Sequence, residues 1–226
     1  SLISPEIFGS LFQGVMDSIE RREMGAHYTE AVNILKVVNG LFMMELRAEF
    51  ATAVGHLNNP TIPKAKRGDL LNALHEKISN LTFLDPACGC GNFLVVAYRE
   101  LRLLELDILD VLYPKDQHGL FNVSDMIKCH IGQFYGIELD EYATHIARVA
   151  MWLTDHQMNM LCAERLGQTR PTVPLTESAT IINGNSLHTD WQVTDYILGN
   201  PPFVGHSYRT KVQQADVTAI MPSEGK

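Results

Sequence analysis

Residues 81–94 read Leu81-Thr82-Phe83-Leu84-Asp85-Pro86-Ala87-Cys88-Gly89-Cys90-Gly91-Asn92-Phe93-Leu94. The apolar run at residues 81–84 predicts a buried strand, and apolar residues recur at helical spacing over residues 93–109. In the turn between them, Gly89 and Gly91 allow positive φ and a close approach of the backbone to a ligand. Asn92 is expected to cap the helix, whose free N–H groups would face the bound molecule. The segment therefore predicts a strand, a ligand-binding loop and a helix.

Three further apolar runs along the chain are each followed by polar residues. They are residues 134–137 before Glu138, residues 179–182 before Asn183-Gly184-Asn185-Ser186, and residues 196–199 before Asn200. With helical segments between them, the runs are typical of an α/β fold built on a parallel sheet. The carboxyl ends of parallel strands lie at one edge of the sheet, where ligands bind. We therefore expect the ends of all four runs to surround one site.

The segment Asn200-Pro201-Pro202-Phe203 combines hydrogen-bond acceptors with an aromatic ring. The Asn200 side-chain oxygen and the Pro201 carbonyl can both accept hydrogen bonds from a planar amino group, while Phe203 offers a face for stacking. An isolated match of this kind is also typical of a turn that ends a strand. In combination with the glycine loop, the segment favours the methylation of an exocyclic amino group.

These motifs resemble those of the amino-group DNA methyltransferases, which use S-adenosylmethionine. That family's first motif reads Asp-Pro-Ala-Cys-Gly-x-Gly-x-Phe-Leu, as residues 85–94 do, and its catalytic motif is Asn-Pro-Pro-Phe or Asn-Pro-Pro-Tyr. Residues 25–29, Gly-Ala-His-Tyr-Thr, are similar to the Gly-x-Tyr-Thr segment of N6-adenine methyltransferases of the type I and fused type II restriction-modification kind. Glu30 stands where that family usually has a proline. The resemblance covers residues 21–209.

The resemblance implies a Rossmann-like class I methyltransferase sheet. This sheet is expected to be incomplete, because the chain ends at Lys226, soon after Phe203. It implies S-adenosylmethionine as the cofactor and DNA as the partner. The residues it assigns to cofactor binding are Ala26, His27, Tyr28, Thr29, Asp85, Pro86, Ala87, Cys88, Gly89, Gly91, Asn92, Phe93, Glu138, Leu139, Asn185, Ser186 and Asn200. The residues it assigns to catalysis are Asn200, Pro201, Pro202 and Phe203.

The residues predicted to contact the ribose and the adenine of the cofactor each have an alternative. Glu138 is expected to accept hydrogen bonds from both ribose hydroxyls, but an acid in this place also stabilises the start of a helix, here predicted to begin at residue 141. Asn185 is our choice for the contact with the cofactor's adenine, and Asn183 is the alternative.

Thr29 and Asp85 also have structural interpretations. Thr29 can cap the helix predicted over residues 31–53, and Asp85 can be an ordinary turn residue before Pro86. The joint spacing of the motifs favours the functional interpretation of each residue.

The cysteines and histidines do not form a metal-binding pattern. Cys88, Cys90, Cys129 and Cys162 lack CxxC spacing, and the nine histidines include no HxxxH or HExxH pair. No cysteine follows a proline, which disfavours the covalent mechanism of cytosine-C5 methyltransferases. The loop also differs from GxGxxG and from the phosphate loop, which disfavours NAD and ATP. We expect reduced thiols and no metal.

The length and the net charge of the chain limit how it can bind DNA. The chain has 226 residues, 46% of them hydrophobic, and a formal net charge of −8, which argues against a stand-alone nucleic-acid clamp. Positive charge gathers only at residues 64–67 and at Arg209 and Lys211. DNA is therefore expected to bind largely through regions missing from this chain, in further domains or subunits. No signal peptide or membrane-spanning run is predicted, so we expect a cytoplasmic protein with no membrane partner.

The chain is predicted to contain two regions. Residues 1–79 form a helical region that carries the segment at residues 25–29 and is broken at residues 58–68. Residues 80–226 form the S-adenosylmethionine-binding catalytic domain. After Phe203 too few residues remain for another helix and strand, so this domain is expected to be truncated.

The predicted function is methyl transfer to the N6 amino group of adenine in DNA, within a restriction-modification or related system. Three alternatives stay open. N4-cytosine methyltransferases act on a similar exocyclic amine, and glutamine N5 protein methyltransferases use Asn-Pro-Pro-Tyr, where this chain has Phe203. The third is a non-catalytic cofactor-binding module of a larger protein, since no DNA-reading region is evident.

Overall fold

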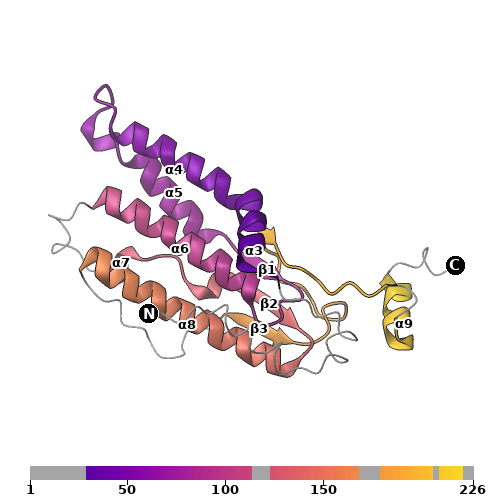
Figure 1. The fold of residues 1–226 in the computed structure, drawn as a ribbon. Helices are drawn as coiled ribbons and strands as arrows, with labels where there is room; N and C mark the ends of the chain where they lie inside the picture. Colours follow the sequence, from indigo (N-terminus) through magenta and orange to yellow (C-terminus); the bar gives the residue numbers. More distant parts are fainter. Residues whose placement is uncertain (1–28, 114–122, 168–178, 206–208, 221–226) are drawn as a thin grey trace.

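The computed structural model describes residues 29–113, 123–167, 179–205 and 209–220. Figure 1 shows a small sheet at one end of a layer of long helices. This is the predicted α/β architecture with a helical region ahead of the sheet. Three residues of the predicted cofactor site, Ala26, His27 and Tyr28, lie outside the described residues.

The sheet contains four parallel strands in the order β3-β2-β1-β4. They are β1 (Phe83–Asp85), β2 (Phe134–Glu138), β3 (Thr180–Asn183) and β4 (Tyr196–Ile197). Each strand lies in one of the four apolar runs, so the strand predictions are confirmed. The order reverses at β1, because β2 and β3 extend the sheet on one side and β4 pairs on the other. Ligands of open α/β sheets bind beyond the strand ends at such a reversal.

Two long helices connect the strands and pack against each other: α6 (Asn92–Leu112) and α8 (Glu141–Leu166). Helix α8 is capped by Asp140, whose carboxylate accepts a hydrogen bond from the backbone N–H of Ala143 at 2.7 Å. It ends at Gly167, which has the left-handed conformation typical of a helix end. The capping residue is therefore Asp140, which leaves Glu138 for another role.

The helical region comprises α3 (Ala31–Val38), the π-helical turn η1 (Asn39–Met43), α4 (Met44–Leu57), the 3-10 turn η2 (Lys64–Lys66) and α5 (Asp69–Asn80). The predicted break at residues 58–68 is confirmed between α4 and α5. The helix predicted over residues 31–53 is present as a continuous helical run that extends to Leu57, but it contains the π turn η1. A π turn holds more residues than an α turn. It lets the consecutive residues Phe42 and Met43 both face the core.

Aromatic stacking joins the helical region to the sheet. The ring centroid of Phe42 lies 5.0 Å from that of Phe83 on β1 and 5.1 Å from that of Tyr196 on β4. Phe83 in turn stacks on Phe134 of β2 at 4.7 Å. Buried aromatic pairs at these separations add to the energy of burying their surface. The N-terminal helices and the sheet therefore share one hydrophobic core.

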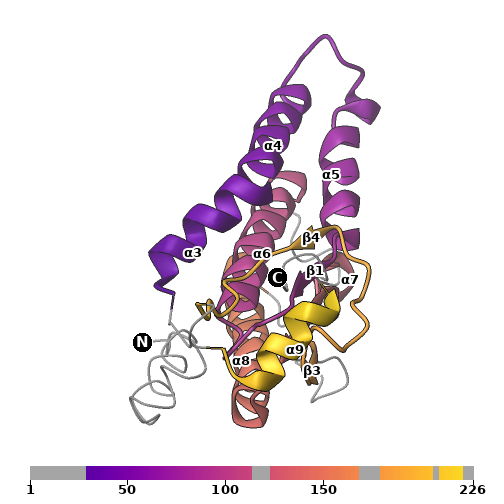
Figure 2. The same ribbon diagram turned by 90° about the vertical axis from the view of Figure 1, so that its right-hand side faces the viewer.

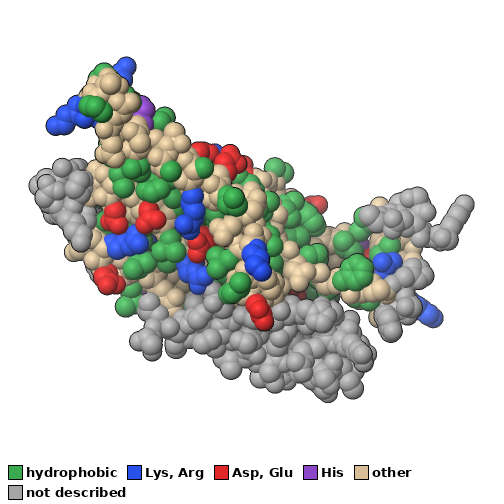
Figure 3. Space-filling model, turned by 45° about the horizontal axis from the view of Figure 1, so that its top comes forward, with side chains coloured by type: hydrophobic (Ala, Val, Ile, Leu, Met, Phe, Trp, Pro, Cys, Tyr) green, Lys and Arg blue, Asp and Glu red, His purple; other side chains and the backbone are tan. Residues whose placement is uncertain are grey.

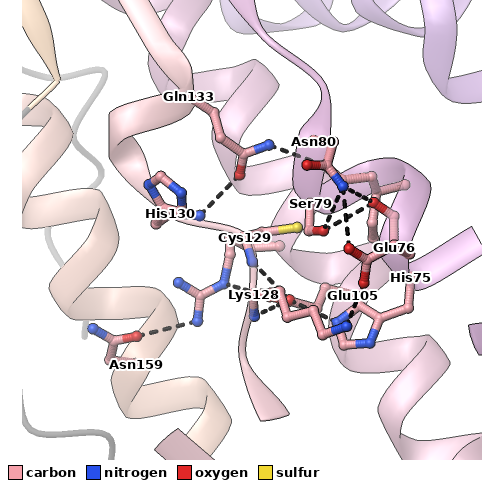
Figure 4. A network of polar contacts seen from close by, with 12 residues as sticks. His75, Glu76, Ser79, Asn80, Glu105, Lys128, Cys129, His130, Gln133 and Asn159 are labelled. Atoms are coloured by element: carbon pink, nitrogen blue, oxygen red, sulfur yellow. Dashed lines mark hydrogen bonds and ion pairs between the residues drawn. The ribbon is translucent and has the colours of Figure 1, made fainter. Parts of the chain in front are cut away.

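A buried polar network lies between α5, α6 and α8 (Figure 4). The fully buried Glu105 lies 3.0 Å from the Nε2 atom of His75, and it accepts hydrogen bonds from the backbone N–H groups of Lys128 and Cys129. Arg102, also fully buried, lies 3.1 Å from both Glu105 and Asp155. Burial alone would raise the pKa of Glu105, but the hydrogen bond from His75 and the charge of Arg102 outweigh it and lower that pKa.

The same network fixes the chain that leads into β2. This segment contains α7 (Val123–Met126) and η4 (Ile131–Gln133). The side-chain amide of Gln133 donates to the backbone carbonyls of Ile78 and Leu81, so the start of β2 is tied to the entrance of β1. These contacts set the parallel register of the two strands that carry Asp85 and Glu138 at their ends.

The surface carries charges of both signs. On the face in Figure 3, Lys and Arg side chains are interspersed with Asp and Glu, and the basic group at the protruding tip lies on the connection between α4 and α5, which contains η2. A phosphate backbone is normally bound by several adjacent cations, and the described residues visible on this face do not supply such a stripe. None of the helices that the structure describes is both long and apolar enough to span a bilayer.

Candidate active site at the carboxyl edge of the sheet

Asp85 ends β1 at the point where the strand order reverses. Its carboxyl group is 1% exposed, and its Oδ1 atom accepts a hydrogen bond from the backbone N–H of Ala87 at 3.0 Å. The pKa of Asp85 is raised from 3.8 to about 7, chiefly by burial and also by the negative charge of Glu138, while the hydrogen bond from Ala87 opposes the shift. Asp85 is thus a buried carboxyl group at the predicted site.

The loop after Asp85 turns sharply into α6. Gly89 and Gly91 have positive φ values of 53° and 83°, as the sequence predicts. A Cβ atom on Gly91 would lie 3.1 Å from that of Ala147, so a glycine here also allows α8 to pack closely. The predicted capping role of Asn92 was wrong: Gly91 occupies the N-cap position, no side chain caps the helix, and Asn92 is its first residue. The start of α6 still presents backbone N–H groups beside the loop.

Glu138 connects the ends of β1 and β2. Its Oε2 atom accepts a hydrogen bond from the backbone N–H of Gly89 at 2.7 Å, and its Oε1 atom accepts one from Asp140 at 2.9 Å. A carboxylate can accept about four hydrogen bonds, so two such bonds leave room for a pair of hydroxyl groups. The side chain of the next residue, Leu139, is mostly exposed at the same edge.

The two asparagines of the predicted adenine contact lie at the end of β3, where Asn183 is the last residue of the strand and Asn185 follows it. The Asn183 amide donates to the backbone carbonyls of Glu138 and Leu139 at 3.0 Å each, which fastens β3 to β2. Asn185 accepts a hydrogen bond from Leu187 and donates one to Asp216 at 3.2 Å. The amide of Asn183 is therefore used in bonding β3 to β2, whereas the amide of Asn185 contacts a more distant segment at Asp216.

Asp216 belongs to α9 (Lys211–Ile220), which lies past the sheet, away from the long helices, in Figure 1 and in front of the strands in Figure 2. Its carboxylate contacts both Asn185 and the Nε2 atom of His188, the latter at 2.9 Å. The helix after the Asn-Pro-Pro-Phe segment thus returns to the loop that follows β3. Nothing in the polar C-terminal sequence indicated this contact.

Gly199 and Asn200 follow β4, and each lies against a distant segment of the chain. The Asn200 Nδ2 atom donates a hydrogen bond to the Oγ1 atom of Thr29, 171 residues away, at 3.1 Å. The preceding Gly199 has a φ of 146°, and a Cβ atom on it would lie 2.5 Å from Oδ1 of Asp85. Pro201 and Pro202 are exposed, and Phe203 is 92% exposed. The structure thereby places Thr29 against Asn200, and Asp85 against the residue directly before Asn200.

The cysteines of the loop are poor nucleophiles. Burial raises the pKa of the Cys88 thiol, and the charges of Asp85 and Glu138 raise it further. Burial and the nearby charges of Glu138 and Asp140 raise the pKa of Cys90 to about 12. A thiol that stays protonated at neutral pH does not act as a nucleophile. Among the described residues there is also no group of three or more His, Cys, Asp or Glu side chains that could hold a metal ion.

Residues 61–226 match the protein family described as MmeI, DNA-methyltransferase domain. The chain belongs to this family. DNA methyltransferase A of Bacillus subtilis strain 168 is 34% identical to it over 227 residues, which are 96% of this chain and 24% of that protein. The solved structure of the type IIL restriction-modification enzyme MmeI in complex with DNA is 45% identical, with a TM-score of 0.87, and the match covers 98% of this chain and 29% of that one.

A third relative of this MmeI-family chain is a putative type II restriction enzyme and methyltransferase of Methanocaldococcus jannaschii. It is 21% identical over 169 residues, which are 67% of this chain and 14% of that protein. The chain thus spans less than a third of each relative. The match to MmeI, at 0.87, confirms the predicted methyltransferase fold class, and the family confirms the resemblance to restriction-modification DNA methyltransferases.

Sequence reasoning missed two residues of this MmeI-type site and misplaced one. Gly199 was not predicted, although a glycine directly before Asn-Pro-Pro signals a conformation that other residues avoid. Asp140 was not predicted as the cap of α8, although it is a good N-cap residue in the right place. Thr29 was predicted to bind the cofactor, with capping of the following helix as a second role; the N-cap of α3 is Glu30, so the capping role was wrong, and the Thr29 hydroxyl contacts Asn200.

Proposed function

We propose that this chain is the catalytic core of a DNA methyltransferase that transfers a methyl group from S-adenosylmethionine to the N6 amino group of adenine, within a restriction-modification system. The observation that carries the proposal is the contact of Thr29 with Asn200, and of Asp85 with the residue directly before Asn200, at the edge of the sheet where the strand order reverses. Ligand sites of α/β sheets lie at that edge. Membership of the MmeI methyltransferase family supports the reaction class.

The residues at this edge fit S-adenosylmethionine better than a dinucleotide. Glu138 has capacity for the ribose hydroxyls, Leu139 offers an exposed apolar side chain for the adenine ring, and Asn185 lies on the next strand end. The acidic side chains of Glu138 and Asp140 lie beside the glycine loop. Such a charge suits a cationic ligand and repels a pyrophosphate. The cofactor, when bound, supplies a methyl group on a positively charged sulfur.

The Asn-Pro-Pro-Phe segment would hold the target base. The Asn200 Oδ1 atom and the Pro201 carbonyl oxygen can accept the two hydrogens of an exocyclic amino group, which stabilises the positive charge that develops on its nitrogen during direct transfer. The largely exposed Phe203 is free to stack on a base rotated out of the duplex. Positioning by these groups, rather than proton removal before attack, would supply most of the rate.

DNA would be recognised mainly by parts of the complete protein that this chain does not contain. The net charge of −8 and the mixed surface in Figure 3 argue against this chain binding DNA alone. MmeI, which is similar to this chain over 29% of its own length, has been solved in complex with DNA. We therefore assign target recognition to further domains or subunits and place only the flipped base at Asn200.

The test is methyl transfer by the complete protein that carries this chain, with nucleoside analysis of the product DNA. We expect N6-methyladenine, and we expect Asn200→Ala to reduce transfer by about 100-fold or more with little change in cofactor affinity. Asn72→Ala, on the exposed surface of α5, is the matched control. N4-methylcytosine in the product would transfer the assignment to cytosine. Methylated peptide without methylated DNA, or cofactor binding without any transfer, would contradict the proposal.

A further inference from the structure

We propose that Thr29 is a positioning residue that sets the orientation of the Asn200 amide; this inference rests on the proposed function. The two side chains come from segments 171 residues apart, and the Asn200 Nδ2 atom donates to the Thr29 Oγ1 atom at 3.1 Å. The hydroxyl of Thr29 is the hydrogen-bond acceptor in this pair. Its role would be to act through Asn200 rather than on the cofactor.

The need for such a residue follows from the chemistry of an amide side chain. Asn carries an acceptor oxygen and a donor NH2 group of nearly the same shape, and rotation by half a turn exchanges them. Only the oxygen can accept a hydrogen from the target amine. With its NH2 group engaged by Thr29, Asn200 presents its Oδ1 atom to the other side. Without that partner, the amide can also present NH2 to the substrate, where two donors would face each other.

The backbone directly before Asn200 is held by a second contact. Gly199 lies so close to Asp85 that a Cβ atom would come within 2.5 Å of Oδ1, and Asp85 is itself buried and bonded to Ala87. The position of residue 200 is therefore set by β1 through Asp85 and Gly199. The rotation of its side chain is set by the N-terminal segment through Thr29. Neither constraint alone defines where the acceptor oxygen points.

Thr29 is free for this task because it does not cap α3. The N-cap is Glu30, whose backbone carbonyl accepts from the N–H groups of Asn33 and Ile34. Helix α3 packs against α6, so Thr29 starts a segment that is anchored to the main helix layer. Removal of its hydroxyl is therefore expected to spare the helix and change the Asn200 contact alone.

The experiment compares Thr29→Val, Thr29→Ser and the control Thr52→Val, whose hydroxyl bonds only within α4. Valine keeps the shape of threonine but lacks the hydroxyl acceptor. In the complete protein we expect Thr29→Val to lower kcat by about 10- to 100-fold while the dissociation constant for S-adenosylmethionine stays unchanged. Thr29→Ser should recover most of the rate, and Thr52→Val should retain it. In an Asn200→Ala background, Thr29→Val should have little further effect on the residual rate.

A second readout does not depend on catalysis. In the 226-residue chain labelled with nitrogen-15, the side-chain NH2 resonances of Asn200, assigned by their loss in Asn200→Ala, should move in Thr29→Val and not in Thr52→Val. If they move but the wild-type protein does not methylate DNA, the contact holds and the proposed function fails. Unmoved resonances, an unchanged kcat, or a weakened cofactor affinity with kcat preserved would each overturn the role of Thr29 as a positioning residue.

Discussion

The substitution Gly199→Ala meets two obstacles where β4 leaves the sheet. Gly199 has a φ of 146°, and a residue with a side chain in this conformation carries a strain energy of about 1–3 kcal/mol. The new Cβ atom would lie 2.5 Å from Oδ1 and 2.9 Å from Cγ of Asp85, well inside contact distance, and overpacking of this kind costs about 1–3 kcal/mol. Asp85 cannot move aside easily because it is buried and bonded to Ala87.

We therefore expect Gly199→Ala to lower the free energy of unfolding by about 2–6 kcal/mol, a large share of the 5–15 kcal/mol typical of a domain. Urea unfolding followed by circular dichroism measures this loss, and methyl transfer should fall because Asn200 is displaced. Gly89→Ala has positive φ but open space around its Cβ, so only about 1 kcal/mol should be lost. Gly40→Ala, inside a helix with open space, should be neutral or stabilising. A loss at Gly199 no larger than that at Gly89 would refute the close approach to Asp85.

Three further predictions concern the carboxylates and the buried network. Glu138→Gln should weaken binding of S-adenosylmethionine by about 10-fold or more in calorimetry, since its amide can accept hydrogen bonds only at one atom; an unchanged affinity would remove Glu138 from the ribose contact. The pKa of Asp85 is raised from 3.8 to about 7, so the folded state holds a proton that the unfolded state releases, and this contribution to stability is complete below pH 4 and lost as pH rises to 7. Asp85→Asn should therefore remove up to about 4 kcal/mol of that pH dependence in urea unfolding between pH 4 and pH 8, and an unaltered pH profile would contradict the assignment. Arg102→Met leaves the buried Glu105 without its cation and should destabilise the fold by about 3–5 kcal/mol in the same assay, whereas a loss below about 1 kcal/mol would show that the ion pair is dispensable.

The four strands were predictable because each has a local cause. The runs before Asp85, Glu138, Asn183 and Asn200 are short, apolar and followed by polar residues, which is typical of strands in a parallel sheet. The central strands β1 and β2 are largely buried, whereas the outer strands β3 and β4 are mostly exposed. The positive φ values of Gly89 and Gly91 follow equally from sequence, because only glycine adopts them without strain. The gathering of the strand ends follows from the parallel arrangement itself.

Other features depend on tertiary packing and were not predictable. The π turn at residues 39–43 exists because Phe42 and Met43 both find space in the core, which depends on Phe83 and Tyr196 in another part of the chain. Whether Asn183 or Asn185 is available for the adenine contact depends on which amide is hydrogen-bonded to the neighbouring strand β2, and that amide belongs to Asn183. The partner of Thr29 is 171 residues away, so the local sequence offered a cofactor-binding or a capping role but not the contact with Asn200.

The proposed function requires the ends of separate strands to form one site for a methyl-donor nucleoside. Isothermal titration of the purified 226-residue chain with S-adenosylmethionine and S-adenosylhomocysteine tests this claim without a DNA target. We predict saturable binding of both ligands at one site per chain. A chain that is folded by circular dichroism and binds neither ligand would contradict the account.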